Sequence, residues 1–410
     1  MVGSHFRDIK STSTPLAMKS TLLTLIALAL LALMGASAQE LTIVEQDWEL
    51  AKTKAKAENK LVLIDFYTTW CGPCKKFTKA VAEDAAFSQG IAQQFVLLKY
   101  DAEKDLPHGL TRKYYVRSYP TYITVTPDGQ TLAKQYGRFQ PTEASKANFL
   151  NFLAEAGTRY NNQQYLTGHN NRFDLEYPEF YTKLIDRVQR PKRSTVAAWW
   201  EDNGMPTNEV GFAVLVYLGG TDAVNNYFIE HRDEFIRLYG APDANKVVRA
   251  IASDRFDKSV AEQSEAGFQA AKTFAMENMN PKKEAESMVH YFQGQYYLAG
   301  KQWEAYGQWL ASDVEAGQLS AMEINYHCWN LVEKCEDIAL LEKAVVWMQE
   351  VVNAAPEYAY IDTYAWLLYK AGQKEAARRA IVEAIAVGKA DGENVSESEN
   401  LLALINENQP

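Results

Sequence analysis

Residues 61–75 read LVLIDFYTTWCGPCK, and this stretch decides the fold of the first part of the chain. Its first four residues are apolar without interruption, which is typical of a strand buried on both faces of a sheet. Cys71 and Cys74 follow with a spacing of three, and Pro73 suits the first turn of a helix, where its missing amide leaves no hydrogen bond unmade. The stretch therefore predicts a central strand that leads into a helix with two cysteines at its start.

The two cysteines are close enough in sequence to react with each other. Residues three apart in a helical turn lie one above the other, within the roughly 4.4–6.8 Å between Cα atoms that a disulfide requires. The helix start stabilises a thiolate, so we expect the pKa of Cys71 to fall from about 8.5 toward about 7. Cys71 is thus the predicted nucleophile, Cys74 resolves the mixed disulfide, and Gly72 leaves room for a partner backbone.

Helix and strand signals surround this stretch over residues 45–157. Asp47 opens an amphipathic helix that ends near Asn59, and a last helix is expected to start at Thr142 and to end at Gly157. The order of the elements predicts an α/β domain. The remaining predicted elements are helices from the cysteines to about residue 86 and near 110–115, and strands at 95–100, 121–126 and 131–136.

The motif W-C-G-P-C-K on this framework resembles the thioredoxin family, over about residues 42–157. The resemblance implies a thioredoxin fold, in which a central mixed sheet is flanked by helices. It also implies that Asp65 is a buried acid that accepts or relays the proton of the Cys74 thiol, and that Lys99 balances its charge. A strand-end capping acid is the alternative for Asp65, and an exposed surface lysine is the alternative for Lys99.

The same resemblance assigns substrate-binding residues around the cysteines. It implies that Pro120 is a cis proline facing the disulfide, and that the backbone of Tyr119 pairs with an extended client segment. Gly137 matches a family glycine beside the same groove. Within the motif itself, the predicted substrate-binding residues are Trp70, Gly72 and Pro73.

The apolar run at residues 21–34 predicts an exported protein. Lys19 precedes the run and a small-residue segment follows it, so a signal peptide over residues 1–38 with cleavage after Ala38 is expected. The run is too short to cross a bilayer comfortably, which disfavours the alternative of a retained anchor. The predicted location is periplasmic or secreted, and the protein is expected to be soluble after cleavage. Whether Met1 or Met18 is the start is left open.

Strand signals nearly vanish after residue 157. We expect a thioredoxin-like domain at 39–157, a helical linker domain at 158–280, and a domain at 281–410 that resembles tetratricopeptide repeats. Segments 300–305 and 372–377 share a glycine turn followed five positions later by alanine. A plain helical bundle is the alternative to the repeat.

Composition and motifs limit the classes of partner and cofactor that this chain is expected to bind. The chain of 410 residues has 42 Lys and Arg against 52 Asp and Glu, a net charge of −10, which disfavours nucleic acid. No second C-x-x-C exists for a zinc site, and no G-x-G-x-x-G follows a strand, so no metal and no cofactor are predicted. Cys328 and Cys335 are predicted to be buried, inert thiols.

These observations predict an exported thiol–disulfide oxidoreductase that reduces disulfide-containing protein clients. The Gly-Pro dipeptide resembles reducing thioredoxins. A membrane thiol–disulfide carrier is the expected electron donor, and the helical region is expected to bind clients or partners. The alternatives are a disulfide oxidant or isomerase, and an interaction scaffold in which the repeat-like array carries the function.

Overall fold

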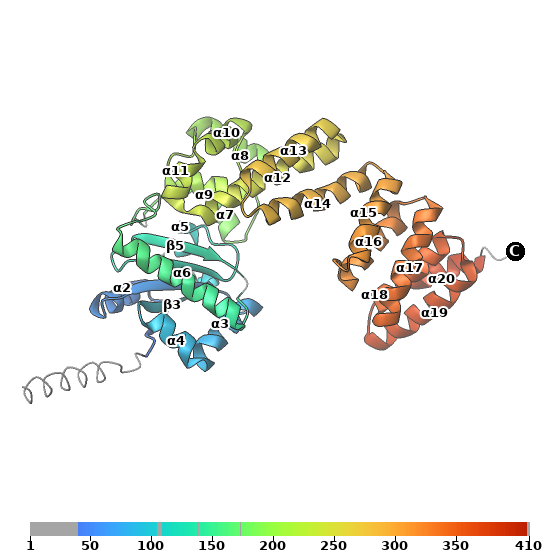
Figure 1. The fold of residues 1–410 in the computed structure, drawn as a ribbon, viewed down its shortest axis with the longest axis horizontal. Coiled ribbons are helices and arrows are strands. Elements are labelled where there is room, and N and C mark those ends of the chain that lie inside the picture. Colours follow the sequence, from blue (N-terminus) through green and yellow to red (C-terminus); the bar gives the residue numbers. More distant parts are fainter. Residues whose placement is uncertain (1–39, 105–108, 138, 173, 408–410) are drawn as a thin grey trace, which may run out of the picture. The chain divides into compact units, whose positions relative to one another are not determined.

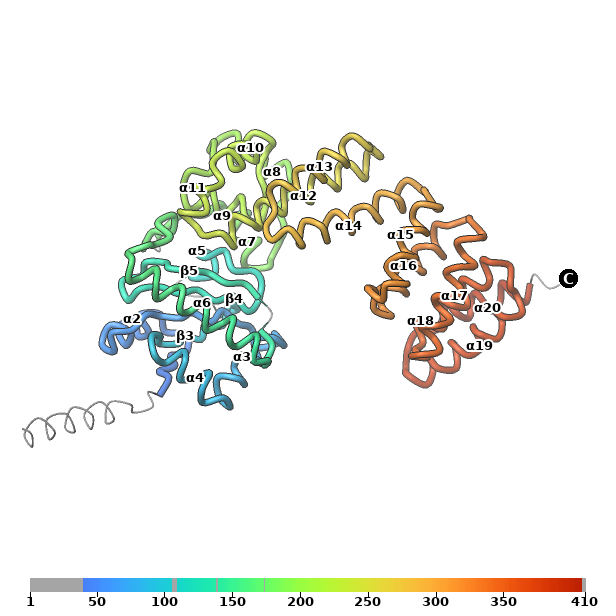
Figure 2. Tube along the Cα trace, viewed as in Figure 1, coloured from blue at the N-terminus to red at the C-terminus, as the bar shows by residue number. Residues whose placement is uncertain are grey.

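The computed structural model describes residues 40–104, 109–137, 139–172 and 174–407. The predicted signal peptide lies outside these residues. The chain divides into two compact units, one up to Val247 and one from Val248 onward, and Figures 1 and 2 trace the elements of each.

The first unit is built on a mixed sheet of five strands in the order β1-β3-β2-β4-β5. Strand β2 pairs in parallel with β3 and antiparallel with β4, so it lies at the centre of the sheet. This confirms the predicted central strand and the α/β class, and adds a short first strand that was not predicted. The strands are β1 (Ile43–Glu45), β2 (Leu61–Tyr67), β3 (Phe95–Asp101), β4 (Thr121–Val125) and β5 (Thr131–Tyr136).

Helices cover both faces of this sheet (Figure 1). Two predicted helix ends are wrong. The helix after the cysteines stops at Glu83, because the side chain of Asp84 accepts the amide hydrogen of Phe87 and caps a new helix. Gly157 lies buried inside its helix, which continues to Asn161. The helices are α2 (Trp48–Ala57), α3 (Gly72–Glu83), α4 (Ala85–Ala92), α5 (Leu110–Lys113) and α6 (Glu143–Asn161), with a 3-10 turn at Ala102–Lys104.

The apolar run of β2 fills two cores because its side chains alternate between the sheet faces. Leu61 and Leu63 pack in the core formed with α3, α4 and α6. Val62 and Ile64 pack in the core formed with α2 and α5. A strand that is apolar on both faces can be stabilised only between two layers of helices, and this burial sets the position of everything that follows it in the chain.

The first unit continues beyond the sheet as a set of helices that pack against it. Lys134 on β5 forms an ion pair with Asp243 at 3.2 Å, and both side chains are fully buried. The helix at 209–218 lies in the core, with Phe212 to Leu215 fully buried. These helices are α7 (Glu179–Ile185), α8 (Arg193–Asn203), α9 (Glu209–Leu218), α10 (Asp222–Glu230), α11 (Arg232–Tyr239) and α12 (Ala241–Glu262), the last of which runs into the second unit.

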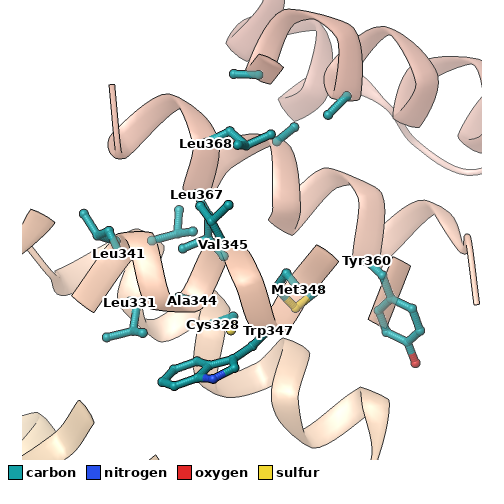
Figure 3. Packing of buried hydrophobic residues seen from close by; sticks show 14 of the residues in the cluster. Cys328, Leu331, Leu341, Ala344, Val345, Trp347, Met348, Tyr360, Leu367 and Leu368 are labelled. Atoms are coloured by element: carbon teal, nitrogen blue, oxygen red, sulfur yellow. The ribbon is translucent and has the colours of Figure 1, made fainter. Parts of the chain in front are cut away.

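The second unit is helical throughout its described residues. Its core gathers Cys328, Leu331, Ala344 and Met348 between neighbouring helices (Figure 3). Within the described residues, no helix is long and apolar enough to span a membrane. Its helices are α13 (Glu265–Asn278), α14 (Lys282–Ala299), α15 (Trp303–Glu315), α16 (Ala321–Lys334), α17 (Ile338–Ala354), α18 (Tyr358–Lys370), α19 (Lys374–Asp391) and α20 (Ser396–Glu407).

Candidate active site

Cys71 and Cys74 form a disulfide at the start of α3, with their Cα atoms 5.3 Å apart. Cys71 is the N-cap residue of the helix, and its Sγ accepts a hydrogen bond from the Cys74 amide at 3.1 Å. Pro73 lies in the first turn. The free amides and the positive end of the helix dipole therefore face the Cys71 sulfur, an arrangement that stabilises negative charge on it.

The turn that holds the disulfide is exposed at Trp70 and Gly72. Trp70 is 56% exposed, while both cysteines are almost completely buried. A Cβ atom added at Gly72 would meet no atom within 4 Å. A partner backbone can therefore approach this turn closely, with the exposed indole of Trp70 beside it.

The loop before β4 lies against Trp70. The peptide bond between Tyr119 and Pro120 is cis, and the rings of Trp70 and Tyr119 meet edge to face with their centroids 5.9 Å apart. The Gly137 amide donates to the carbonyl oxygen of Pro120 at 3.4 Å, and Gly137 also has open space at its Cβ position. The structure thus places Trp70, Tyr119, Pro120 and Gly137 in one continuous region.

Asp65 lies on β2, on the sheet face that α3 covers. Neither of its carboxylate oxygens has a hydrogen-bond partner among the described residues, and the side chain is fully buried. Burial raises the pKa of Asp65 to about 7, against the opposing charge of Lys99. Lys99 is the cross-strand neighbour of Asp65, and its Nζ lies 3.6 Å from a carboxylate oxygen of Glu45.

The sequence interpretation missed two groups beside Trp70. The Trp70 indole donates to Glu103 at 2.8 Å. The guanidinium of Arg187 lies 5.5 Å from the Trp70 ring centroid and 5.1 Å from that of Tyr119. The signal available in the sequence was the basic segment after α7, which holds Arg187, Arg190, Lys192 and Arg193.

The other two cysteines belong to the second unit. Cys328 and Cys335 are free and fully buried. Burial raises the pKa of both thiols. The predicted burial of both thiols is confirmed, and neutral, inaccessible thiols are expected to react slowly. Among the described residues, no three His, Cys, Asp or Glu side chains are grouped as they would be around a metal ion.

Similarity to known proteins agrees with this geometry. Residues 43–127 match a family model described as thioredoxin-like. Thioredoxin from Staphylococcus aureus is 42% identical over 89 residues, which cover 22% of this chain and 79% of that protein. This chain belongs to the thioredoxin family. Thioredoxin-1 from Drosophila melanogaster is 40% identical over 67 residues, so the match spans 16% of this chain and 58% of that relative.

Solved structures of thioredoxins also match the chain. The germline-specific thioredoxin Deadhead from Drosophila shares 32% identity over 25% of this chain and 88% of its own, with a TM-score of 0.20. A thioredoxin from Halobacterium salinarum shares 27% identity over 28% of this chain and 94% of its own, with a TM-score of 0.21. The family match at residues 43–127 is a minor share of the 410 residues, and helices make up most of the described residues after it.

Proposed function

We propose that this chain is an exported thiol–disulfide oxidoreductase that reduces disulfides in client proteins. The observation that carries the proposal is the Cys71–Cys74 disulfide at the helix start, with the Cys71 sulfur accepting an amide hydrogen bond. A sulfur that is stabilised as an anion is both a good attacking group and a good leaving group, and thiol–disulfide exchange needs both properties.

The reaction starts from the dithiol form and passes two electrons to the client. The Cys71 thiolate attacks one client sulfur, the client S–S bond breaks, and the first client thiolate leaves and takes up a proton. Cys74 then loses its proton and attacks the Cys71 sulfur of the mixed disulfide. The Cys71–Cys74 bond forms, and the second client thiolate leaves and is protonated.

Asp65 is the group that we assign to the Cys74 proton. A carboxyl whose pKa is raised to about 7 by burial can both accept and release a proton near neutral pH. Lys99 is assigned a positioning role, because its charge opposes the effect of burial on that carboxyl. We assign the binding of the extended client segment to four residues: Trp70, Tyr119, Pro120 and Gly137.

The compartment and the partners are part of the proposal. The apolar run at 21–34 supports export, and the Gly72-Pro73 dipeptide supports the reducing direction. A dithiol carrier in the membrane is proposed to reduce Cys71–Cys74 again after each turnover. The helices of the second unit, proposed to be repeat-like, would bind clients or partners.

Insulin reduction tests the activity. The dithiol-treated full chain should reduce insulin disulfides, and Cys71→Ser should lower the rate to that of the small-molecule dithiol alone. Cys74→Ser should stop after the first step and accumulate the mixed disulfide, visible by mass spectrometry. Cys328→Ala is the matched control, because it removes a buried thiol elsewhere in the chain, and it should leave the rate unchanged.

The redox potential tests the direction. Equilibration with glutathione should give a value near the roughly −270 mV of reducing thioredoxins. A value above about −200 mV would contradict the reductase and favour the oxidant or isomerase. Equal insulin reduction by the wild type and Cys71→Ser would instead leave the interaction scaffold as the better account.

A further inference from the structure

Arg187 reaches the candidate active site from outside the sheet. It follows the end of α7, and its side chain lies over both aromatic rings, 5.5 Å from the centroid of Trp70 and 5.1 Å from that of Tyr119. One of its guanidinium nitrogens donates to the carbonyl oxygen of Arg117 at 3.0 Å. The contact with two rings and one carbonyl holds the guanidinium in place while the residue stays exposed to solvent.

Two further arginines, Arg117 and Arg190, lie near enough to Arg187 or to each other for their charges to interact. Arg117 lies two residues before Tyr119, and its pKa is lowered first by its burial and then by the neighbouring charges of Arg187 and Arg190. Within the described parts of the chain, none of the three arginines forms an ion pair with a carboxylate. Among the residues that the structure describes, the acidic group beside Trp70 is Glu103, which accepts the indole hydrogen. Within these described residues, positive charge therefore predominates around Arg187.

The nearest acidic residue along the chain does not cancel this charge. Asp186 precedes Arg187, but its carboxylate accepts two hydrogen bonds from Arg112, at 3.2 and 2.6 Å. This bidentate pair ties the end of α7 to α5 and occupies both carboxylate oxygens. Asp186 thus anchors the chain beside Arg187 and does not itself pair with the Arg187 guanidinium.

We propose that Arg187 selects clients whose reactive cysteine is flanked by Asp or Glu. The inference rests on the proposed function, because the client is defined by the disulfide that Cys71 attacks. An arginine fork binds a carboxylate through two parallel hydrogen bonds, which makes it a selective partner for acidic side chains. The net charge of −10 belongs to the whole chain, whereas this surface beside the disulfide carries the opposite sign.

The position of Arg187 sets where the acidic residue lies in the client. Trp70 directly precedes Cys71 in the chain, and Tyr119 precedes the cis proline. An extended client segment advances about 3.3 Å per residue. A carboxylate that meets a guanidinium over the Trp70 and Tyr119 rings therefore belongs to a residue close to the client cysteine in its sequence.

Two disulfide-linked peptide substrates test the inference. They have the same length and differ only near the cysteines, where one carries Asp and Glu and the other Asn and Gln. The full chain is reduced, freed of reductant and mixed with each peptide, and the second-order rate constant of peptide reduction is measured. We expect the acidic peptide to react about tenfold faster at low salt, and this preference to disappear at about 1 M salt, where charges are screened within about 3 Å.

Two variants of Arg187 complete the test. Arg187→Glu should make the acidic peptide the slower one. Arg187→Gly should bring the two rates together and is expected to fold normally, because Arg187 has a φ of 60°, a left-handed conformation that glycine adopts without strain. Arg237→Gln is the matched control: Arg237 is an exposed arginine on α11 that pairs with Glu234, and its loss should leave the tenfold preference intact.

The outcomes separate this inference from the proposed function. Equal rates for both peptides with the wild type, or an unchanged preference in a folded Arg187→Gly variant, would overturn the selection of acidic clients and leave the reductase in place. If the wild type reduces neither peptide faster than Cys71→Ser does, the proposed function itself fails.

Discussion

Asp65 shows how strongly one buried residue can respond to its surroundings. Its carboxyl is fully buried on β2, and burial raises its pKa to about 7 although the charge of Lys99 acts in the opposite direction. Burial disfavours the charged form because protein solvates it less well than water does. The raised pKa suits Asp65 to proton transfer near neutral pH. At higher pH the buried carboxyl must ionise, and this lowers the stability of the folded state.

Asp65→Asn should remove a pH dependence of stability. In the wild type the folded state holds the Asp65 proton up to about pH 7, whereas the unfolded chain loses it near the ordinary value of 3.8. Stability therefore falls as pH rises from about 4 to about 7, by about 1.4 kcal/mol for each pKa unit. We expect Asp65→Asn to be more stable than the wild type by roughly 2–4 kcal/mol at about pH 8, and close to it near pH 4.

Urea unfolding of both oxidised proteins at the two pH values measures this difference. Parallel pH profiles for the wild type and the variant would contradict the raised pKa. Insulin reduction by the same variant tests the proposed proton transfer separately, and its rate should fall most at neutral pH.

At the scale of elements, close packing joins the segment after α6 to the helices. The Gly168 amide donates to the carbonyl oxygen of Leu238 at 2.8 Å. A Cβ atom added at Gly168 would overlap the ring of Tyr239. That ring cannot move aside freely, because it stacks on Phe212 with the ring centroids 3.9 Å apart. A glycine is thus required at position 168 because the segment at 238–239 passes so close to it. Its own backbone conformation does not require a glycine.

Gly168→Ala should destabilise the first unit by about 1–3 kcal/mol, the usual cost of adding a methyl group to a filled space. Gly137→Ala is the matched control, because its Cβ would meet no atom within 4 Å. The control should change the free energy of unfolding by less than about 0.5 kcal/mol. Thermal unfolding of the two variants gives the comparison. Equal midpoints would contradict the prediction, because they would mean that the Tyr239 ring moves aside for the added methyl group at little cost.

At the scale of the whole molecule, buried charges join the thioredoxin-like sheet to the helices that follow it in the first unit. Lys134 on β5 pairs with Asp243 in the first turn of α12, and its Nζ also donates to the carbonyl oxygen of Tyr114 at 2.7 Å. Lys113 pairs with Glu209 at 2.8 Å, again between almost fully buried side chains. Each buried charge is tolerated because it is paired with an opposite charge. The lysines come from the thioredoxin-like part, and the carboxylates come from the helices that follow it.

Lys134→Met should therefore cost about 3–5 kcal/mol, because it leaves the Asp243 carboxylate buried without its cation. The double variant Lys134→Met, Asp243→Leu should recover much of that loss, since it removes both charges together. Urea unfolding of the single and double variants measures the coupling. Strictly additive losses would contradict an ion pair that holds the sheet and the helices together.

The sequence alone determined four of the five strands, the cysteine pair and the family resemblance, because these depend on local patterns. The apolar run of β2, the spacing of Cys71 and Cys74 and the helix-starting Pro73 act over a few neighbouring residues, so their consequences follow from the order of the amino acids. The end of α6 could not be derived in this way. Gly157 reads as a stop signal, yet it lies inside the helix where the backbone passes close to Gln94.

Only the tertiary structure decided what stands beside the disulfide. Arg187 is more than a hundred residues from Cys71 in the sequence, and nothing in the basic segment that contains it points to Trp70. Its position follows from the packing of α7 against α5, through the pair of Asp186 with Arg112. Contacts between distant segments form when complete faces of helices and sheets pack together. A local sequence pattern therefore does not predict which residues meet.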